Sequence, residues 1–229
     1  MRSNADLAHD YADFVQQERA TLLAGGATHD TPLGEGSPRW GMSTIMRPDA
    51  GALTRLADLG RSAERATGPG HWVHGKDELH FTLRSLESYR HRIPADDPAR
   101  RTAGAALREA ADGVGPVRFD LRGPIPHRGG IMVLAYPEDD TIWTLQRRYA
   151  EALNNRSAGD FESWQRDRWY VSLVHFARPL ASPEAVLTWA DEHAEIAVGS
   201  TEVTAVEIIQ ALQEGPRVRL KTLESAPLS

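Results

Sequence analysis

Two short runs of the sequence place a ring with a polar tip two residues before a hydroxyl group. His80 and Thr82 form the first pair, and Tyr170 and Ser172 form the second. Because side chains at positions i and i+2 of a β-strand project from the same face, each pair can present its two polar groups side by side. An imidazole in such a pair can transfer a proton while the neighbouring hydroxyl binds a phosphate oxygen. A single His-x-Thr run is also common on half-buried strands by chance. The rest of the sequence must therefore decide whether the pair is a functional site or a structural feature of the strand.

Other polar residues near the first pair are candidates for binding a ligand. Arg84 follows Thr82 by two positions, so a regular strand predicts that it shares the face of His80, where a guanidinium suits a phosphate or a carboxylate. An exposed charge at the end of a strand is an equally good interpretation of Arg84. His74 lies on the strand expected before the first pair, and its spacing favours a place beside the site over a role in binding zinc.

His175 is the candidate nearest the second pair. It follows Tyr170 by an odd number of residues, so a regular strand sends the two side chains to opposite faces. Only a bulge near Leu173 or Val174 would bring His175 round to the face of Tyr170 and Ser172. The sequence therefore favours a core or surface histidine, with a role in substrate binding as the alternative.

The segment 124–130, with the sequence PIPHRGG, is expected to be a loop able to overhang the site. Its Arg128 is a candidate for binding an anion. Its His127 fits an exposed turn better than a site residue.

The composition excludes several classes of function. With no cysteine, the chain has no disulfides, thiolate zinc sites or cysteine nucleophiles. A net charge of −6 argues against binding long nucleic acid, although a small phosphorylated ligand remains open. The apolar run 131–136 is too short to cross a bilayer and no signal peptide is apparent, so a cytoplasmic protein without a membrane partner is expected. Since Lys occurs only at 76 and 221 among 26 basic residues, the composition resembles a bacterial sequence rich in G and C.

Hydrophobic periodicity and capping residues predict a mixed order of helices and strands. The expected helices cover residues 5–23, 49–66, 98–111, 138–154 and 183–193. The expected strands cover residues 41–47, 71–74, 79–86, 117–121, 131–136, 169–176, 203–212 and 217–223. Because no glycine-rich phosphate loop follows a strand, this order favours an antiparallel α+β arrangement over a doubly wound dinucleotide fold. Residues 1–39 are expected to form an N-terminal helix and loop, and residues 40–229 a single domain.

The run from Glu78 to Leu83 resembles the first signature of the two-histidine (2H) phosphoesterase superfamily, which includes the 2′-5′ RNA ligases and cyclic nucleotide phosphodiesterases. The run from Trp169 to Leu173 occupies the place of the second signature. The resemblance covers roughly residues 40–223. It implies a bilobal α+β fold in which two antiparallel sheets flank a central cleft, with helices outside.

The resemblance also implies a mechanism. In that superfamily two histidines flank the phosphorus, one assisting the attacking water and the other protonating the leaving oxygen, while hydroxyls hold the phosphoryl oxygens and no metal or cofactor is needed. By matching position, His80 and Thr82 receive the first pair of roles, and Ser172 receives the second hydroxyl. Tyr170 stands where the second histidine belongs. A phenol with a pKa of ~10 is a poor base at neutral pH, whereas it can donate a hydrogen bond or act as an acid.

Three functional hypotheses follow. The leading one is an enzyme that acts on a phosphorylated or nucleotide-like small molecule, with His80 as acid or base. The second is a ligand-binding protein that has lost catalysis but keeps Thr82, Ser172 and Arg84. The third is a biosynthetic enzyme that uses His80 and Tyr170 on a substrate without phosphate. The sequence does not indicate an oligomeric state.

Overall fold

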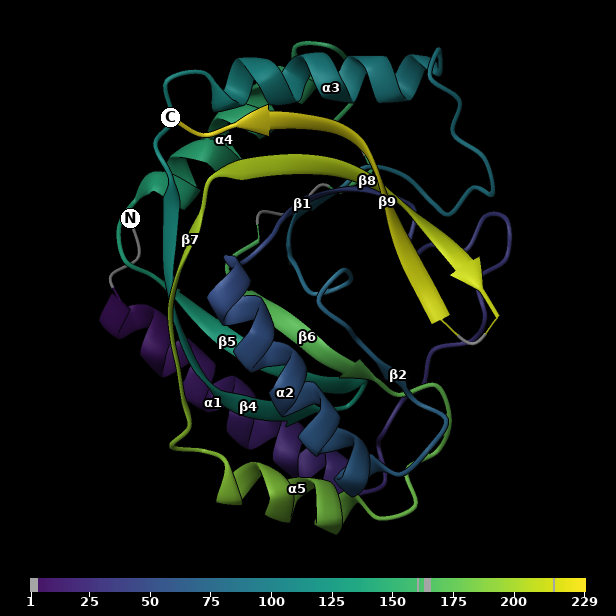
Figure 1. The fold of residues 1–229 in the computed structure, drawn as a ribbon, viewed down its shortest axis with the longest axis vertical. Coiled ribbons are helices and arrows are strands. Elements are labelled where there is room, and N and C mark those ends of the chain that lie inside the picture. Colours follow the sequence, from purple (N-terminus) through teal and green to yellow (C-terminus); the bar gives the residue numbers. More distant parts are fainter. Residues whose placement is uncertain (1–3, 160, 163–165, 216) are drawn as a thin grey trace.

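The computed structural model describes residues 4–159, 161–162, 166–215 and 217–229 (Figure 1). Its helices are α1 (Asn4–Leu23), α2 (Ala50–Thr67), α3 (Pro98–Ala111), α4 (Thr141–Asn154) and α5 (Pro183–Glu192). Its strands are β1 (Met42–Met46), β2 (Trp72–Val73), β3 (Phe81–Ser85), β4 (Val117–His127), β5 (Gly130–Pro137), β6 (Trp169–His175), β7 (Ala197–Val203), β8 (Ala205–Glu214) and β9 (Arg217–Pro227). No helix of the described residues combines the length and the apolar content needed to cross a bilayer.

The strands form two antiparallel sheets. Sheet A has the order β3-β1-β8-β9, and sheet B has the order β2-β6-β5-β4-β7. Helices α3 and α4 lie together beside sheet A, whereas α2 and α5 lie together beside sheet B (Figure 1). The predicted α+β fold with two antiparallel sheets is therefore confirmed.

Capping residues that are visible in the sequence set where the helices begin. The Asp49 carboxylate accepts hydrogen bonds from the backbone N–H groups of Gly51 (2.8 Å) and Ala52 (3.0 Å) at the start of α2. Its second oxygen accepts a hydrogen bond from the hydroxyl of Thr201 on β7 (2.7 Å), so the cap also joins α2 to sheet B. Ser182 caps α5 in the same way, through the N–H of Ala185 (3.1 Å).

Two expectations about strands were wrong. Residues 124–127 continue β4 instead of forming a loop, and β7 was not predicted at all. Pro124 and Pro126 lack the N–H group that a central strand needs. However, β7 pairs with β4 only as far as Arg122, so beyond that residue no described strand is paired on this side of β4 and the two prolines remove no ladder hydrogen bond there.

Helix α1 covers the face of sheet B opposite α2. Its buried Leu7 and Tyr11 pack against Met132 and Leu134 of β5, whereas the alternate β5 residues belong to the main core. The Tyr11 hydroxyl donates a hydrogen bond to the carbonyl oxygen of Ala135 (3.2 Å). The same hydroxyl accepts one from the backbone N–H of Trp169 (2.8 Å), so α1 is bonded to β5 and to the strand start of β6.

Replacing Tyr11 with Phe should lower the free energy of unfolding by about 1–3 kcal/mol, because two buried backbone groups would lose their partner. Urea denaturation measures the loss. Tyr136→Phe is the matched control, since Tyr136 packs edge-on against Tyr11 at 5.0 Å and is only half-buried. Equal losses in the two variants would contradict a specific contribution from the Tyr11 hydroxyl.

Candidate active site

The register of β3 against β1 shows a one-residue bulge directly after the first signature pair. Thr82 lies opposite Ile45, whereas Arg84 lies opposite the preceding residue, Thr44. Because the residue between Thr82 and Arg84 has no partner on β1, side chains beyond it project from the other face. The hydroxyl of Thr44 is hydrogen-bonded to that of Tyr149 on α4 (2.8 Å), so Arg84 lies on the face that α4 covers.

The prediction that Arg84 shares the face of His80 is therefore wrong. The Arg84 guanidinium donates hydrogen bonds to the carbonyl oxygens of Gly159 (2.8 Å) and Glu162 in the loop that follows α4. These contacts hold the loop against β3.

The second signature strand has a bulge at the equivalent place. Ser172 lies opposite Met132, and Val174 lies opposite the next β5 residue, Ile131, so Leu173 is the extra residue. A regular strand would send His175 to the face opposite Ser172, but one inserted residue reverses that parity. His175 therefore lies on the face of Tyr170 and Ser172. The sequence left this open as the alternative that requires a bulge near Leu173 or Val174.

The bulge brings His175 into a cluster of aromatic rings. The His74 ring lies 5.0 Å from that of His175, and the Trp40 ring lies 4.9 Å from it. His175 is opposite Trp72 of the edge strand β2, and both histidines are buried, with exposed fractions of 6% for His74 and 7% for His175. The expectation that His74 borders the site agrees with this geometry.

His80 immediately precedes β3 and is half-buried. Its Nδ1 lies 2.6 Å from the carbonyl oxygen of Glu78. Since a carbonyl can only accept a hydrogen bond, Nδ1 carries the proton and Nε2 keeps a free lone pair. Burial lowers the pKa of His80 to about 4, with further lowering by the positive charges of Arg47, His175 and Arg166, against the effect of the Glu78 carbonyl. The ring is thus neutral at pH 7.

Burial also lowers the pKa of the other two histidines. Burial lowers the pKa of His175, while Asp30, whose Oδ2 lies 3.1 Å from Nδ1, acts in the opposite direction. Burial also lowers the pKa of His74 well below its usual range, with further lowering by His175 and His80. Within the described part of the chain, the buried Nε2 of His74 has no hydrogen-bond partner.

The remaining predicted residues of the second signature take different places. Tyr170 is half-buried and packs on the apolar cluster beneath α1, together with Phe14 and Leu134. Thr82 and Ser172 are half-buried on the two signature faces. The structure thus separates the ring at position 170, which packs under a helix, from the ring at position 175, which joins the other histidines.

Arg128, a predicted anion-binding residue, is paired with a carboxylate of α1. Its guanidinium and its backbone N–H both donate to the buried carboxylate of Glu18 on α1, at 2.6 Å and 2.7 Å. His127, at the end of β4, also belongs to the surroundings of His175, whose charge adds to burial in lowering the pKa of His127 to about 3.

Two residues next to the histidines carry no signal in the sequence. Asp30 lies in a stretch rich in Gly, Thr and Pro, and Arg166 lies in the loop before β6, where no periodicity marks a position as facing the site. The carboxylate of Glu162 binds Arg166 (2.9 Å) and the backbone N–H of Ser85 (2.7 Å), which places this ion pair beside β3. No group of three metal-binding side chains is found among the described residues.

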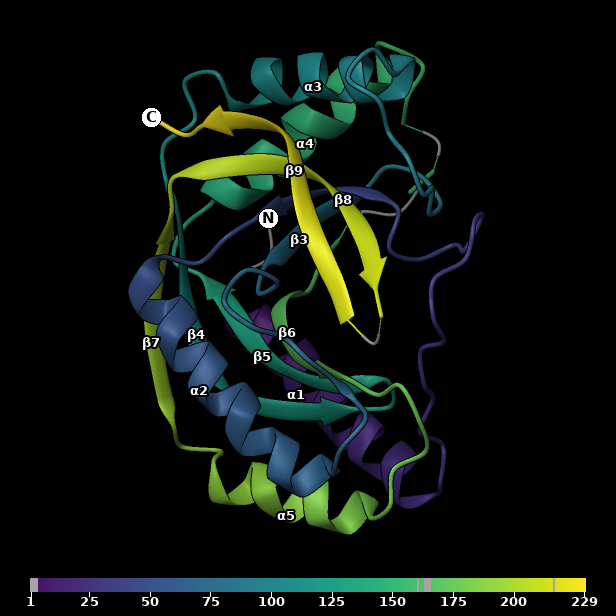
Figure 2. The same cartoon turned by 45° about the vertical axis from the view of Figure 1, so that its right-hand side comes forward.

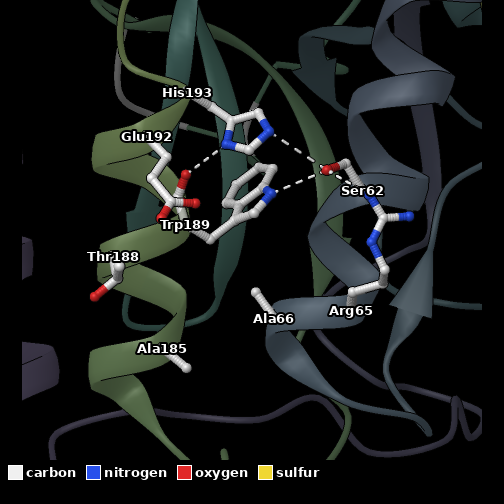
Figure 3. Close-up of a pocket in the computed structure, with 8 residues that line it drawn as sticks. All are labelled: Ser62, Arg65, Ala66, Ala185, Thr188, Trp189, Glu192 and His193. Carbon is white, nitrogen blue, oxygen red and sulfur yellow. Dashed lines mark hydrogen bonds between the residues drawn. The ribbon is translucent and has the colours of Figure 1, made fainter.

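A separate hollow of about 480 Å³ lies between α2 and α5 (Figure 3). At its centre the Ser62 hydroxyl accepts hydrogen bonds from the indole N–H of Trp189 (3.1 Å) and from Arg65 (3.2 Å). His193 donates from Nδ1 to the carbonyl oxygen of Trp189 (2.7 Å), so its Nε2 can accept the Ser62 proton at 3.4 Å. These hydrogen bonds join the two helices on the face of sheet B that lacks the signature residues.

Comparison with known proteins identifies the fold. No family model matches the sequence, and no curated protein is similar to it in sequence. Among solved structures, TT0787 of Thermus thermophilus superposes with a TM-score of 0.59 and 14% identity, over 82% of this chain and 97% of that chain. E. coli LigT in complex with 3′-AMP gives 0.55 and 11% identity, over 83% and 98%. A structure described as a phosphoesterase gives 0.51 and 15% identity, over 83% and 98%. The chain therefore has a LigT-like fold, as the resemblance over residues 40–223 implied.

Proposed function

We propose that this protein is a phosphoesterase that hydrolyses a cyclic phosphodiester in a small nucleotide-like molecule, with His80 as its general base and His175 as its general acid. The bulge at Leu173 carries the proposal, because it supplies a histidine on the face where Tyr170 replaces the expected one. The LigT-like fold supports it, and E. coli LigT has been crystallised with 3′-AMP, phosphate, NADP+ and ATP. The net charge of −6 favours such a small ligand over long nucleic acid.

The surroundings of the two histidines suggest different roles. His80 has an unprotonated Nε2, and burial and the positive charges of Arg47 and Arg166 favour its neutral form, so it suits the general base. His175 has the Asp30 carboxylate beside its Nδ1, which favours the protonated ring, so it suits the general acid. Two groups whose surroundings push their pKa values apart can divide the two proton transfers between them.

The proposed step balances without another reactant. The Nε2 of His80 takes a proton from water as the water oxygen bonds to phosphorus. The bond from phosphorus to one ribose oxygen breaks, and the Nε2 of His175 gives its proton to that oxygen, which leaves a phosphomonoester. The hydroxyls of Thr82 and Ser172 bind the phosphoryl oxygens, and the half-exposed Trp40 ring offers a surface on which a base can stack.

The variants His80→Ala and His175→Ala should each lower kcat/KM for 2′,3′-cyclic AMP at least ~100-fold, since each removes one proton transfer. Tyr170→Phe is the matched control at the signature position and should stay within about threefold of the wild type, because the ring packs under α1. Product release is followed by chromatography. Full activity of His80→Ala would contradict the proposal, and tight binding of the nucleotide without turnover would favour the ligand-binding hypothesis instead.

The pH profile gives a second test. The base must be unprotonated, so kcat/KM should rise as the pH increases through the pKa of His80, about 4. The acid must be protonated, so kcat/KM should fall as the pH rises through the pKa of His175, which burial keeps below the ordinary value of about 6.5. A bell-shaped profile with its maximum on the acid side of 6.5 is expected, and a maximum above about pH 8 would contradict these roles.

A further inference from the structure

The segment between α1 and β1 crosses from sheet B to sheet A. Residues 28–37, called here the crossing segment, begin on sheet B, where the N–H of Thr28 donates to the carbonyl oxygen of Arg128 (2.7 Å). They end beside sheet A, where the N–H of Leu33 donates to the side chain of Gln213 on β8 (3.1 Å). Figure 2 shows this part of the chain along the right-hand side of the molecule. The crossing segment is thus bonded to both halves of the fold.

Asp30 of the crossing segment is fixed beside His175. Its backbone N–H donates to the carbonyl oxygen of Phe176 (2.6 Å), the residue that follows His175. Its Oδ1 accepts a hydrogen bond from Arg39 (2.5 Å), and its Oδ2 lies 3.1 Å from Nδ1 of His175. Among the described residues, Oδ2 is buried and has no polar contact besides this ion pair, which meets the distance but not the angle of a hydrogen bond.

We infer that Asp30 is the positioning residue of His175: its carboxylate holds the Nδ1–H of the ring, turns Nε2 toward the reacting group and stabilises the imidazolium. This inference rests on the proposed function of His175 as general acid. The bound Nδ1–H fixes one tautomer, as carboxylates do for other catalytic histidines. The crossing segment therefore completes the site from outside the two signature strands.

The other charged groups around His175 oppose its protonation. Arg39 binds the other oxygen of Asp30 and lowers the pKa of His175. The rings of His74, which follows β2, and of His127 at the end of β4 also interact with His175. Asp30 is the carboxylate that faces His175 in this group. Its own pKa is lowered by His175, Arg39 and His127, against the effect of burial, so it stays ionised over the working pH range. Removing the charge of Asp30 should therefore lower the pKa of His175, so that a smaller fraction of the ring is protonated at a given pH.

The test uses the full-length protein and the variant Asp30→Asn, which keeps the shape of the side chain and removes its charge. Two-dimensional ¹H–¹⁵N NMR of the His175 ring, assigned with His175→Ala, reports tautomer and pKa without any substrate. The neutral His175 ring of the wild type should carry its proton on Nδ1, and the pKa of His175 should be lower in Asp30→Asn. Glu35→Gln is the matched control, because Glu35 of the crossing segment binds the N–H of His91 (2.8 Å) instead of the site.

Activity on 2′,3′-cyclic AMP supplies the second readout. In Asp30→Asn, kcat at neutral pH should fall roughly tenfold for each unit by which the pKa of His175 falls, with KM little changed and the alkaline limb of the profile moved to lower pH. Glu35→Gln should match the wild type in both experiments.

The outcomes separate the two claims. A neutral wild-type His175 ring that carries its proton on Nε2 instead of Nδ1 would overturn the positioning role even if Asp30→Asn failed to fold, and so would an unchanged His175 pKa in a folded variant. If the NMR results are as expected but neither His80→Ala nor His175→Ala changes turnover, the positioning role stands as a structural fact and the proposed function fails.

Discussion

The geometry of the candidate site depends on one constraint, the period of two along a β-strand. A residue inserted without a partner reverses the facing of every side chain beyond it. Both signature strands contain such an insertion directly after the signature hydroxyl, between Thr82 and Arg84 on β3 and at Leu173 on β6. On β6 the bulge adds His175 to the signature face, and on β3 it removes Arg84 from that face. Both signature strands thus contain a one-residue bulge, but one bulge brings a polar side chain to the signature face and the other moves one away from it.

The N-terminal residues give the two rings of the second signature strand different surroundings. Helix α1 packs over Tyr170 and ties its Tyr11 hydroxyl to the start of β6, which makes this end of the strand part of an apolar cluster. The crossing segment reaches the other end and sets Asp30 beside His175. A phenol held in an apolar cluster suits packing, whereas an imidazole beside a carboxylate suits proton transfer. This division separates the ring at position 170, which packs under α1, from the ring at position 175, which lies beside Asp30.

Local patterns were enough to predict most of the elements, because caps and periodicity are local signals. Asp49 and Ser182 begin helices as predicted, and alternation marked the strand of each signature. The facing of Arg84 and His175 was not predictable, since a bulge is defined by the partner strand, and the buried pair Leu173 and Val174 fits either register. Strand β7 was missed because its small and polar residues give a weak strand signal. Asp30 was missed because its partner, His175, is distant in the sequence.

The two histidines His80 and His175 are proposed to face the same ligand, whereas Tyr170 is not. A titration with 3′-AMP, followed through the assigned ring signals of the three residues by NMR, tests this most directly. We predict that the signals of His80 and His175 shift together and saturate at the same ligand concentration, while those of Tyr170 change little. A saturable shift of the Tyr170 and His80 signals without any shift of the His175 signals would contradict the proposal, because His175 would then lie outside the ligand site.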